Sequence, residues 1–432
     1  MSTPGTNRLS AYLHIPFCER KCIYCDFYSI ENLSLRSEFV DLLLREIDLK
    51  LEAYPALGGR TLQTIFFGGG TPSLLTPGEL ERILRKLERY FEISSDCEFT
   101  LECNPGTITL EKLRGYKSLG VNRLSFGVQS FDAEELKFLG RIHDAAEARE
   151  AVALARQAGF DNVSIDLIFA LPGQTESTLA HTLDEAIALE TDHISAYNLI
   201  VERGTPLFRL VQLGKVIELD SDRAAHLFSL VQERLAAAGF AQYEISNYAK
   251  QPPPAPRLEK AGKTISPLRR GQVVVNRCKH NLVYWDGFKD YVSFGPSAHE
   301  FLDGERAWNV SSLEEYGKAI RAGKLPTINR ERLTKEERRT EVLYLQLRST
   351  GIRLSEFMEV FGEDLLLNSN IHDFVAEEMV TVNNGVLALT AKGYRFCDAI
   401  VTRLMETEHR MDMRLSASLQ SESSILNILP IL

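Results

Sequence analysis

The chain has 432 residues, enough for two or three domains and a large buried core. Its 44% hydrophobic and 25% charged residues are typical of a globular protein, and its net charge of -10 argues against a nucleic-acid partner bound through a broad basic face. The polar start, Met1 to Leu9, argues against a secretory signal, and no apolar run of about 18 residues predicts a membrane span, which leaves peripheral association open. We therefore expect a cytoplasmic protein, in a compartment where thiols stay reduced.

Short β-rich runs alternate with amphipathic stretches over the first half of the chain. The expected strands are Ala11–Phe17, Thr64–Phe67, Glu98–Glu102, Arg123–Val128, Asn162–Ala170 and His193–Ile200. The expected helices between them include Ser37–Ala53, Gly78–Tyr90, Ala145–Ala158 and Ser177–Leu189. Alternation of this kind predicts parallel strands joined by right-handed crossovers. The predicted fold class is therefore α/β, a partial (β/α)6 TIM-like barrel followed by a small, mainly helical C-terminal domain.

The strand–helix rhythm stops after about residue 205, which predicts a change of organisation there. We expect four regions: residues 1–205 form the partial barrel, 206–330 extend it, 331–405 form the small C-terminal domain, and 406–432 are a tail. A helix at Asp222–Ala238 precedes a proline-rich stretch at 250–272, whose composition indicates an exposed insertion. A short β-hairpin is expected near Val380–Leu389.

Three cysteines, Cys18, Cys22 and Cys25, lie within eight residues just after the first expected strand. Three thiolates on one short loop can hold an iron–sulfur cube and leave its fourth iron free for a substrate or cofactor. Structural zinc is the less favoured alternative, because it needs a fourth ligand and only Cys97 or Cys103 is available. Disulfides fit poorly with the odd count of seven cysteines. The triplet therefore predicts an iron–sulfur cluster.

Polar or glycine-rich runs fall at the C-terminal ends of the expected strands. They are Cys18–Cys25, Gly68–Thr71, Glu102–Asn104, Gln129, Asp166 and Tyr197. The C-terminal ends of parallel barrel strands form one rim, and active sites lie at that rim. Strand ends also carry polar residues because they meet water, but six on one rim favour a functional site.

Six sequence runs carry a resemblance to a known family. They are Tyr12-Leu-His-Ile-Pro-Phe-Cys18, Gly68-Gly-Gly-Thr-Pro72, Glu102-Cys-Asn-Pro105, Gly127-Val-Gln-Ser-Phe131, Gly140-Arg-Ile-His143 and Asp166-Leu-Ile-Phe-Ala-Leu-Pro-Gly-Gln-Thr175. The Cys-x3-Cys-x2-Cys spacing with the triple glycine resembles the radical S-adenosylmethionine superfamily. The whole set is similar to its oxygen-independent coproporphyrinogen III oxidase group, above all to the haem chaperones in it. The resemblance runs from about Leu9 to Leu404.

The resemblance implies a 4Fe-4S cluster held by the three cysteines, with S-adenosylmethionine at the open iron as the source of a 5′-deoxyadenosyl radical. At matching positions, Tyr12 and Tyr24 flank the cluster and cofactor, and Gly69, Gly70 and Thr71 contact the methionine part. Glu102, Gln129 and Asp166 engage the amine or the ribose hydroxyls, and Arg141 pairs with the methionine carboxylate. No catalytic residue is assigned beyond these.

Two functions stay open within this group. One is oxidative decarboxylation of coproporphyrinogen III to protoporphyrinogen IX by radical chemistry, and the other is haem binding with transfer to an acceptor protein that the sequence does not identify. The oxidases resembled have a further cysteine two places after the triplet, where this chain has Asp26-Phe27. They also have a substantial N-terminal extension, where this chain has only 17 residues before Cys18. We therefore expect a chaperone without coproporphyrinogen oxidase activity.

The run Cys278-Lys-His-Asn-Leu-Val-Tyr-Trp285 also matches the chaperones, in which the histidine is implicated in haem binding. Imidazole is a common axial ligand of haem iron, and Tyr284 and Trp285 offer flat apolar surface. On its own, His280 would be read as an ordinary hydrogen-bonded histidine. In this context it is the predicted haem ligand, and Cys278 is a less favoured one.

Overall fold

A computed structural model describes residues 7–251 and 276–406. Its centre is a twelve-stranded sheet in the order β12-β11-β10-β9-β1-β2-β3-β4-β5-β6-β8-β7. The six strands β1 to β6 are parallel and adjacent in chain order: β1 Arg8–Ile15, β2 Thr61–Gly69, β3 Glu92–Cys103, β4 Arg123–Gln129, β5 Val163–Phe169 and β6 His193–Asn198. Because β12 and β7 do not pair, the described sheet is open, and the predicted partial α/β barrel is confirmed.

Short strands extend the parallel sheet on both sides. They are β7 Phe240–Gln242, β8 Asn247–Lys250, β9 Tyr291–Phe294, β10 His299–Leu302, β11 Glu305–Asn309 and β12 Thr327–Arg332. Strand β9 pairs with β1 in parallel, so residues beyond the insertion return to the first strand of the chain. The sequence did not predict these strands individually, because they contain only three to six residues and their alternation is too short to read.

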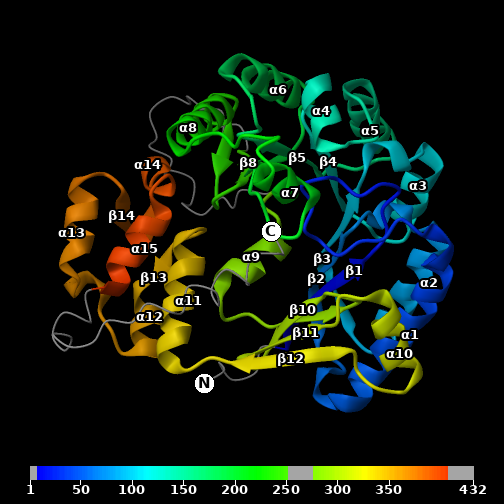
Figure 1. The fold of residues 1–432 in the computed structure, drawn as a ribbon. Coiled ribbons are helices and arrows are strands. Elements are labelled where there is room, and N and C mark those ends of the chain that lie inside the picture. The colour runs from blue at the N-terminus through cyan, green and yellow to red at the C-terminus, as the bar shows by residue number, and fades with distance from the viewer. Residues whose placement is uncertain (1–6, 252–275, 407–432) are drawn as a thin grey trace, which may run out of the picture.

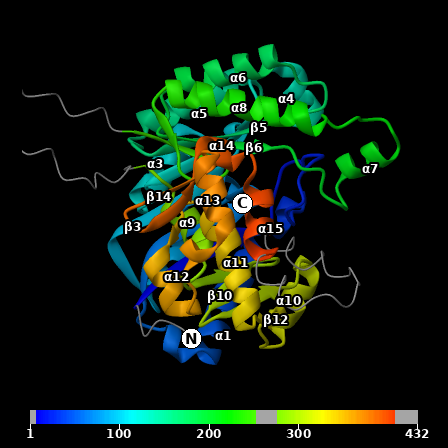
Figure 2. The ribbon, with the colours of Figure 1, turned by 90° about the vertical axis from the view of Figure 1, so that its left-hand side faces the viewer.

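Helices cover the outer face of the sheet (Figure 1). Their bounds are α1 Arg36–Ala53, α2 Pro77–Glu88, α3 Leu110–Ser118, α4 Ala133–Leu139, α5 Ala145–Gln157, α6 Glu176–Ala188 and α8 Ser221–Ala237. Helix α7, Pro206–Gln212, stands away from this layer (Figure 2). Capping boxes begin α2 at Thr76 and α5 at Asp144, each with a glutamate three residues on. None of the described helices is long and apolar enough to cross a membrane.

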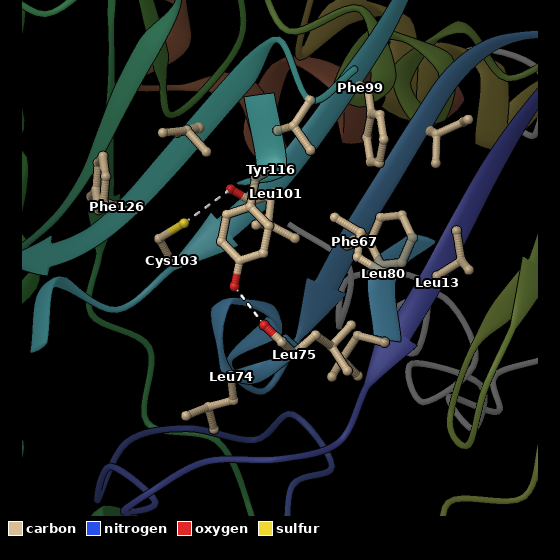
Figure 3. Close-up of a cluster of buried hydrophobic side chains, with 14 of the residues drawn as sticks. Leu13, Phe67, Leu74, Leu75, Leu80, Phe99, Leu101, Cys103, Tyr116 and Phe126 are labelled. Carbon is tan, nitrogen blue, oxygen red and sulfur yellow. Dashed lines mark hydrogen bonds between the residues drawn. The ribbon is translucent and has the colours of Figure 1, made fainter. Parts of the chain in front are cut away.

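The main core lies between the sheet and these helices (Figure 3). Leu13, Phe67 and Leu101 come from three neighbouring strands, and Leu80 and Tyr116 come from the helices that cover them. The Tyr116 hydroxyl donates to the Leu75 carbonyl at 2.6 Å, which satisfies this polar group inside the core. One face of each strand is therefore used for packing, and the other face is left for the site.

A second hydrophobic core lies in the C-terminal part. It is built from α11 Lys335–Leu347, α12 Leu354–Phe361, α13 Ser369–Ala376, α14 Ala391–Tyr394 and α15 Cys397–Glu406, with a small sheet of β13 Ile352–Arg353, β15 Val386–Leu389 and β14 Val380–Asn383. The predicted helical region and hairpin are thus confirmed, while the predicted domain boundaries stay a prediction. Nearly all of the proline-rich insertion at 250–272 and of the tail at 406–432 lies outside the described residues.

Helices α9, Lys279–Asp286, and α10, Leu313–Arg321, belong to the region after the insertion. Helix α10 packs against α1, whereas α9 lies inside the curve of the parallel strands (Figure 1). This places the haem motif of the sequence next to the inner face of the barrel.

Candidate functional site

The inner face of the parallel strands is polar, because side chains alternate between the two faces of a strand and the apolar set faces the outer helices. The residues of this inner face include Tyr12 and His14 on β1, Phe66 and Gly68 on β2, Glu98 and Glu102 on β3, Ser125 on β4, and Asp166 on β5. Most of them are buried. Polar groups without exposure need partners, so their contacts define what the barrel can bind.

Backbone hydrogen bonds hold the cysteine loop against the end of β2. The amide of Cys18 donates to the Ile30 carbonyl at 3.0 Å, which closes the loop on itself. The amide of Thr71 donates to the Phe17 carbonyl at 2.7 Å, which joins the triple-glycine turn to the first cysteine. The two strand ends named by the sequence motifs are therefore one structural unit.

The three thiols lie on this unit in partly buried surroundings. Cys18 Sγ accepts a hydrogen bond from Thr71 Oγ1 at 3.5 Å, and Cys22 Sγ accepts one from Arg141 Nη1 at 3.3 Å. Burial, together with the charge of the nearby Cys22, raises the pKa of Cys25 to about 12. Without a metal the Cys25 thiol holds its proton, and binding of iron would release it.

The two cysteines that a zinc site would need are placed elsewhere. Cys97 and Cys103 belong to the hydrophobic core on the outer face of β3, and the Cys103 thiol donates to the Leu101 carbonyl at 3.6 Å (Figure 3). Within residues 7–251 and 276–406, no three side chains of His, Cys, Asp or Glu surround a single metal position. An iron–sulfur cube does not need three side chains around a single metal position, because each thiolate binds a different iron.

The glycine turn packs closely against the cysteine loop and the first strand. Gly69 has a φ of +106°, a conformation that favours glycine. A Cβ atom on Gly70 would lie 2.7 Å from the Phe17 carbonyl oxygen, and one on Gly68 would lie 3.1 Å from the Tyr12 ring. Side chains at these positions would collide with the backbone of the loop or with the tyrosine. Glycine is therefore required at these positions, and the turn, which we call the cradle, lies against the cysteine loop, where the methionine part of the implied cofactor would bind.

Two half-buried carboxyl groups lie on β3 and β5, and the first of them contacts this turn. Glu102 Oε2 accepts a hydrogen bond from the Gly69 amide at 3.1 Å, and Asp166 accepts one from Ser125 Oγ at 3.2 Å. Burial and then the charge of Asp166 raise the pKa of Glu102 to about 8. Burial also raises the pKa of Asp166. A cation or a set of hydroxyl donors bound here would favour the ionised carboxylates, which fits an ammonium group and a ribose.

Arg141, Gln129 and Tyr24 border the other side of the cysteine loop. Besides Cys22, Arg141 donates to the Gly127 carbonyl at 2.5 Å, while nothing among the described residues accepts a hydrogen bond from its buried Nε. Gln129 has a φ of +72°, which is uncommon outside glycine and typical of functional positions. Burial raises the pKa of Tyr24, and the Arg141 charge opposes that rise. The free donor of Arg141 fits a carboxylate ligand.

The structure thus gathers the predicted residues around the ends of β1 to β5. Tyr12, Gly69, Gly70 and Glu102 lie together, and Thr71, Arg141 and Tyr24 lie against the thiols. Sequence reasoning did not single out His14, whose Nε2 donates to the Tyr28 carbonyl at 2.8 Å and whose Nδ1 meets the Tyr12 hydroxyl at 3.1 Å. Its position two residues after Tyr12, on the same strand face, is the signal that would have found it.

The predicted haem residue lies deeper in the barrel, on α9. Glu98 of β3 accepts the amides of Lys279 at 2.9 Å and His280 at 3.0 Å, and the Cys278 thiol donates to it at 3.5 Å. A carboxylate at a helix N-terminus satisfies free amides and interacts favourably with the helix dipole. Glu98 therefore fixes the start of α9, and with it His280, to the wall of the barrel.

The His280 ring is 1% exposed, and both of its nitrogens have partners. Nδ1 lies 2.6 Å from Thr64 Oγ1, and Nε2 lies 2.8 Å from the Tyr284 hydroxyl. Burial, followed by the charge of Arg123, lowers the pKa of His280 to about 3, so the ring is neutral, as iron ligation requires. In this conformation neither nitrogen is free for iron, and ligation through Nε2 needs Tyr284 to move away.

Comparisons with known proteins agree with this geometry. The radical SAM superfamily model matches residues 12–186, and the HemN C-terminal domain model matches residues 333–396. Heme chaperone HemW of Bacillus subtilis is 36% identical over 389 residues, which is 89% of this chain and 96% of that protein. Heme chaperone HemW of Escherichia coli K12 is 37% identical over 293 residues, 67% of this chain and 69% of that protein.

A solved structure of coproporphyrinogen III oxidase (HemN) from Escherichia coli shares the fold with a TM-score of 0.73. It is 22% identical and covers 92% of this chain and 90% of its own. That level of identity shows the partial barrel and its C-terminal addition, but not an activity. The long relatives, the two domain models and the cysteine and glycine geometry lead to one assignment. The chain belongs to the HemW family of the radical S-adenosylmethionine superfamily.

Proposed function

We propose that this protein is a haem chaperone, which binds haem and transfers it to an acceptor protein in the cytoplasm. The observation that carries the proposal is the similarity to a named haem chaperone along 96% of that relative's length. The presence of His280, Tyr284 and Trp285 on one buried helix supports it from this chain's own residues. The identity of the acceptor is not part of the proposal.

We further propose that Cys18, Cys22 and Cys25 hold a 4Fe-4S cluster, each thiolate on one iron. When bound, such a cluster supplies single electrons to S-adenosylmethionine. Arg141 donates to Cys22 and so would favour its thiolate, and Thr71 does the same at Cys18. The protein's own part is to orient the thiols and to keep water away from them.

The proposed cofactor site is the cradle beside the cluster loop. Gly69, Gly70 and Thr71 would contact the methionine part, and the free Nε of Arg141 would bind its carboxylate. The remaining ligands would be Tyr12, Tyr24, Glu102, Gln129 and Asp166, which border the same space. Glu102 and Asp166, both inside the barrel, would accept hydrogen bonds from the amine or the ribose.

The proposed haem ligand is His280 through Nε2. Its neutral imidazole has the right chemistry, and Thr64 holds the opposite nitrogen, which sets the orientation of the ring. The Tyr284 hydroxyl competes for Nε2 at 2.8 Å. Haem binding would therefore break the hydrogen bond between His280 and Tyr284 and bring out a ring that is 1% exposed in this conformation.

Anaerobically reconstituted protein tests the proposal directly. After incubation with haem and gel filtration, we expect about one haem per chain, and with coproporphyrinogen III, S-adenosylmethionine and a reductant we expect no decarboxylation. Retention of no haem would refute the chaperone function. Formation of protoporphyrinogen IX would instead establish the oxidase function.

A further inference from the structure

An aromatic stack joins the haem motif to the cofactor cradle. The His280 ring lies on the Phe66 ring with centroids 4.9 Å apart and planes 21° from parallel. Phe66 lies in turn on Tyr12, at 6.2 Å and 26°. The three side chains are 1%, 9% and 7% exposed, respectively. The His280 ring also lies against Tyr12 itself, with centroids 6.3 Å apart and planes 27° from parallel, so the three rings form one mutually packed cluster. Phe66 contacts both the proposed haem ligand and a proposed cofactor residue within it.

Two rings of this cluster, Phe66 and Tyr12, border the glycine cradle. A Cβ atom on Gly68 would lie 2.9 Å from the Phe66 ring and 3.1 Å from the Tyr12 ring, so the two rings pack directly against the glycine turn. The Tyr12 hydroxyl meets His14, which is bonded to the carbonyl of Tyr28 behind the cysteine loop. A shift of either ring would change the shape of the cradle directly.

The third ring of the cluster is that of His280. It is held in place by Phe66, by Thr64 at Nδ1 and by Tyr284 at Nε2. Haem cannot reach a ring that is 1% exposed, so binding requires the ring to leave its position on Phe66. Phe66 and Tyr12, which border the cradle, then lose the His280 ring that packs against them.

We infer that Phe66 is a positioning residue shared by the two sites, and that binding of haem opposes binding of S-adenosylmethionine. This inference rests on the proposed function. Haem binding withdraws His280 from Phe66 and loosens the cradle, whereas a bound cofactor fixes Phe66 and Tyr12 and so keeps His280 buried. Because binding free energies are linked, each ligand weakens the other by the same factor. Loading with cofactor thus favours release of haem.

The size of the effect follows from the contact that is lost. One stacked aromatic pair corresponds to an affinity change of about three- to tenfold. We therefore expect saturating S-adenosylmethionine to weaken haem binding by about this factor, and haem to weaken cofactor binding equally.

Haem titrations followed by absorbance test this on cluster-reconstituted protein with and without S-adenosylmethionine. We expect the shift in the wild type and a smaller one in Phe66→Leu, because Tyr12 still contacts His280 in that variant. Tyr284→Phe, which frees Nε2 and leaves the stack in place, should bind haem more tightly and keep the shift. Equal haem affinities with and without cofactor in the wild type would overturn the inference and leave the chaperone function intact.

A reciprocal measurement uses the wild type alone and does not depend on the folding of a variant. Equilibrium dialysis of S-adenosylmethionine with and without haem must give the same factor as the haem titrations. Equal cofactor affinities in the two states would refute the coupling. Failure to bind haem at all would refute the proposed function and, with it, this inference.

Discussion

The raised pKa of Glu102 predicts that cofactor binding depends on pH. Burial and the charge of Asp166 bring this pKa to about 8, and the proposed role of Glu102 requires the ionised carboxylate. With that pKa, roughly one tenth of Glu102 is ionised at about pH 7 and roughly nine tenths at about pH 9. Affinity for S-adenosylmethionine that depends on this charge should therefore rise about tenfold over this range.

The assay is equilibrium dialysis of S-adenosylmethionine with anaerobically reconstituted protein at several pH values. The cofactor's own amine titrates in the same range, so the informative quantity is the affinity of the wild type divided by that of Glu102→Gln. The ratio should increase with pH, because only the wild type gains a charge. A ratio that stays constant would show that Glu102 does not act through its charge, and the reasoning would fail.

Three further predictions concern stability and the cluster. Lys50 and Glu300 form a buried ion pair at 2.5 Å. Lys50→Met alone should therefore lower the free energy of unfolding by about 3–5 kcal/mol, because it leaves a buried charge without its partner. The double variant Lys50→Met with Glu300→Leu should lower it by much less, and chemical denaturation measures both. Burial raises the pKa of Glu244 from 4.5 to about 8, which binds extra protons in the folded state, so stability should fall as pH rises through this window. The unfolding temperature of Glu244→Gln should fall less over this window than that of the wild type, because Glu102 still contributes its own fall, and parallel curves for the two proteins would contradict the prediction. Gly70→Ala should lower the iron content after reconstitution because its Cβ meets the loop backbone, whereas Gly78→Ala, with nothing within 4 Å, should not.

Much of the barrel was predictable, because its strands and helices have strong periodicity and clear start signals. Helix α2 begins at Pro77, one residue before the expected Gly78, and Thr76 caps it in a capping box. Boundaries were less accurate: the first strand ends at Ile15, before Pro16, rather than at Phe17. Proline lacks the amide that a continuing strand would use.

The proposed cofactor residues could be located from the sequence because they are local features of consecutive strand ends. The position of His280 was not, since its ring partner Thr64 is 216 residues away in sequence. The role of Glu98 in holding α9 was invisible for the same reason, because a capping carboxylate from another strand leaves no local pattern. Phe66 was read as part of a strand, and only the packing shows that it touches both sites.

The central claim is that this chain binds haem through His280. Its most direct test is a haem titration followed by absorbance on cluster-reconstituted wild type, His280→Ala and Tyr284→Phe. The account predicts saturable binding by the wild type, loss or a spectral shift in His280→Ala, and binding at least as tight in Tyr284→Phe. Binding that is the same in wild type and His280→Ala would contradict it.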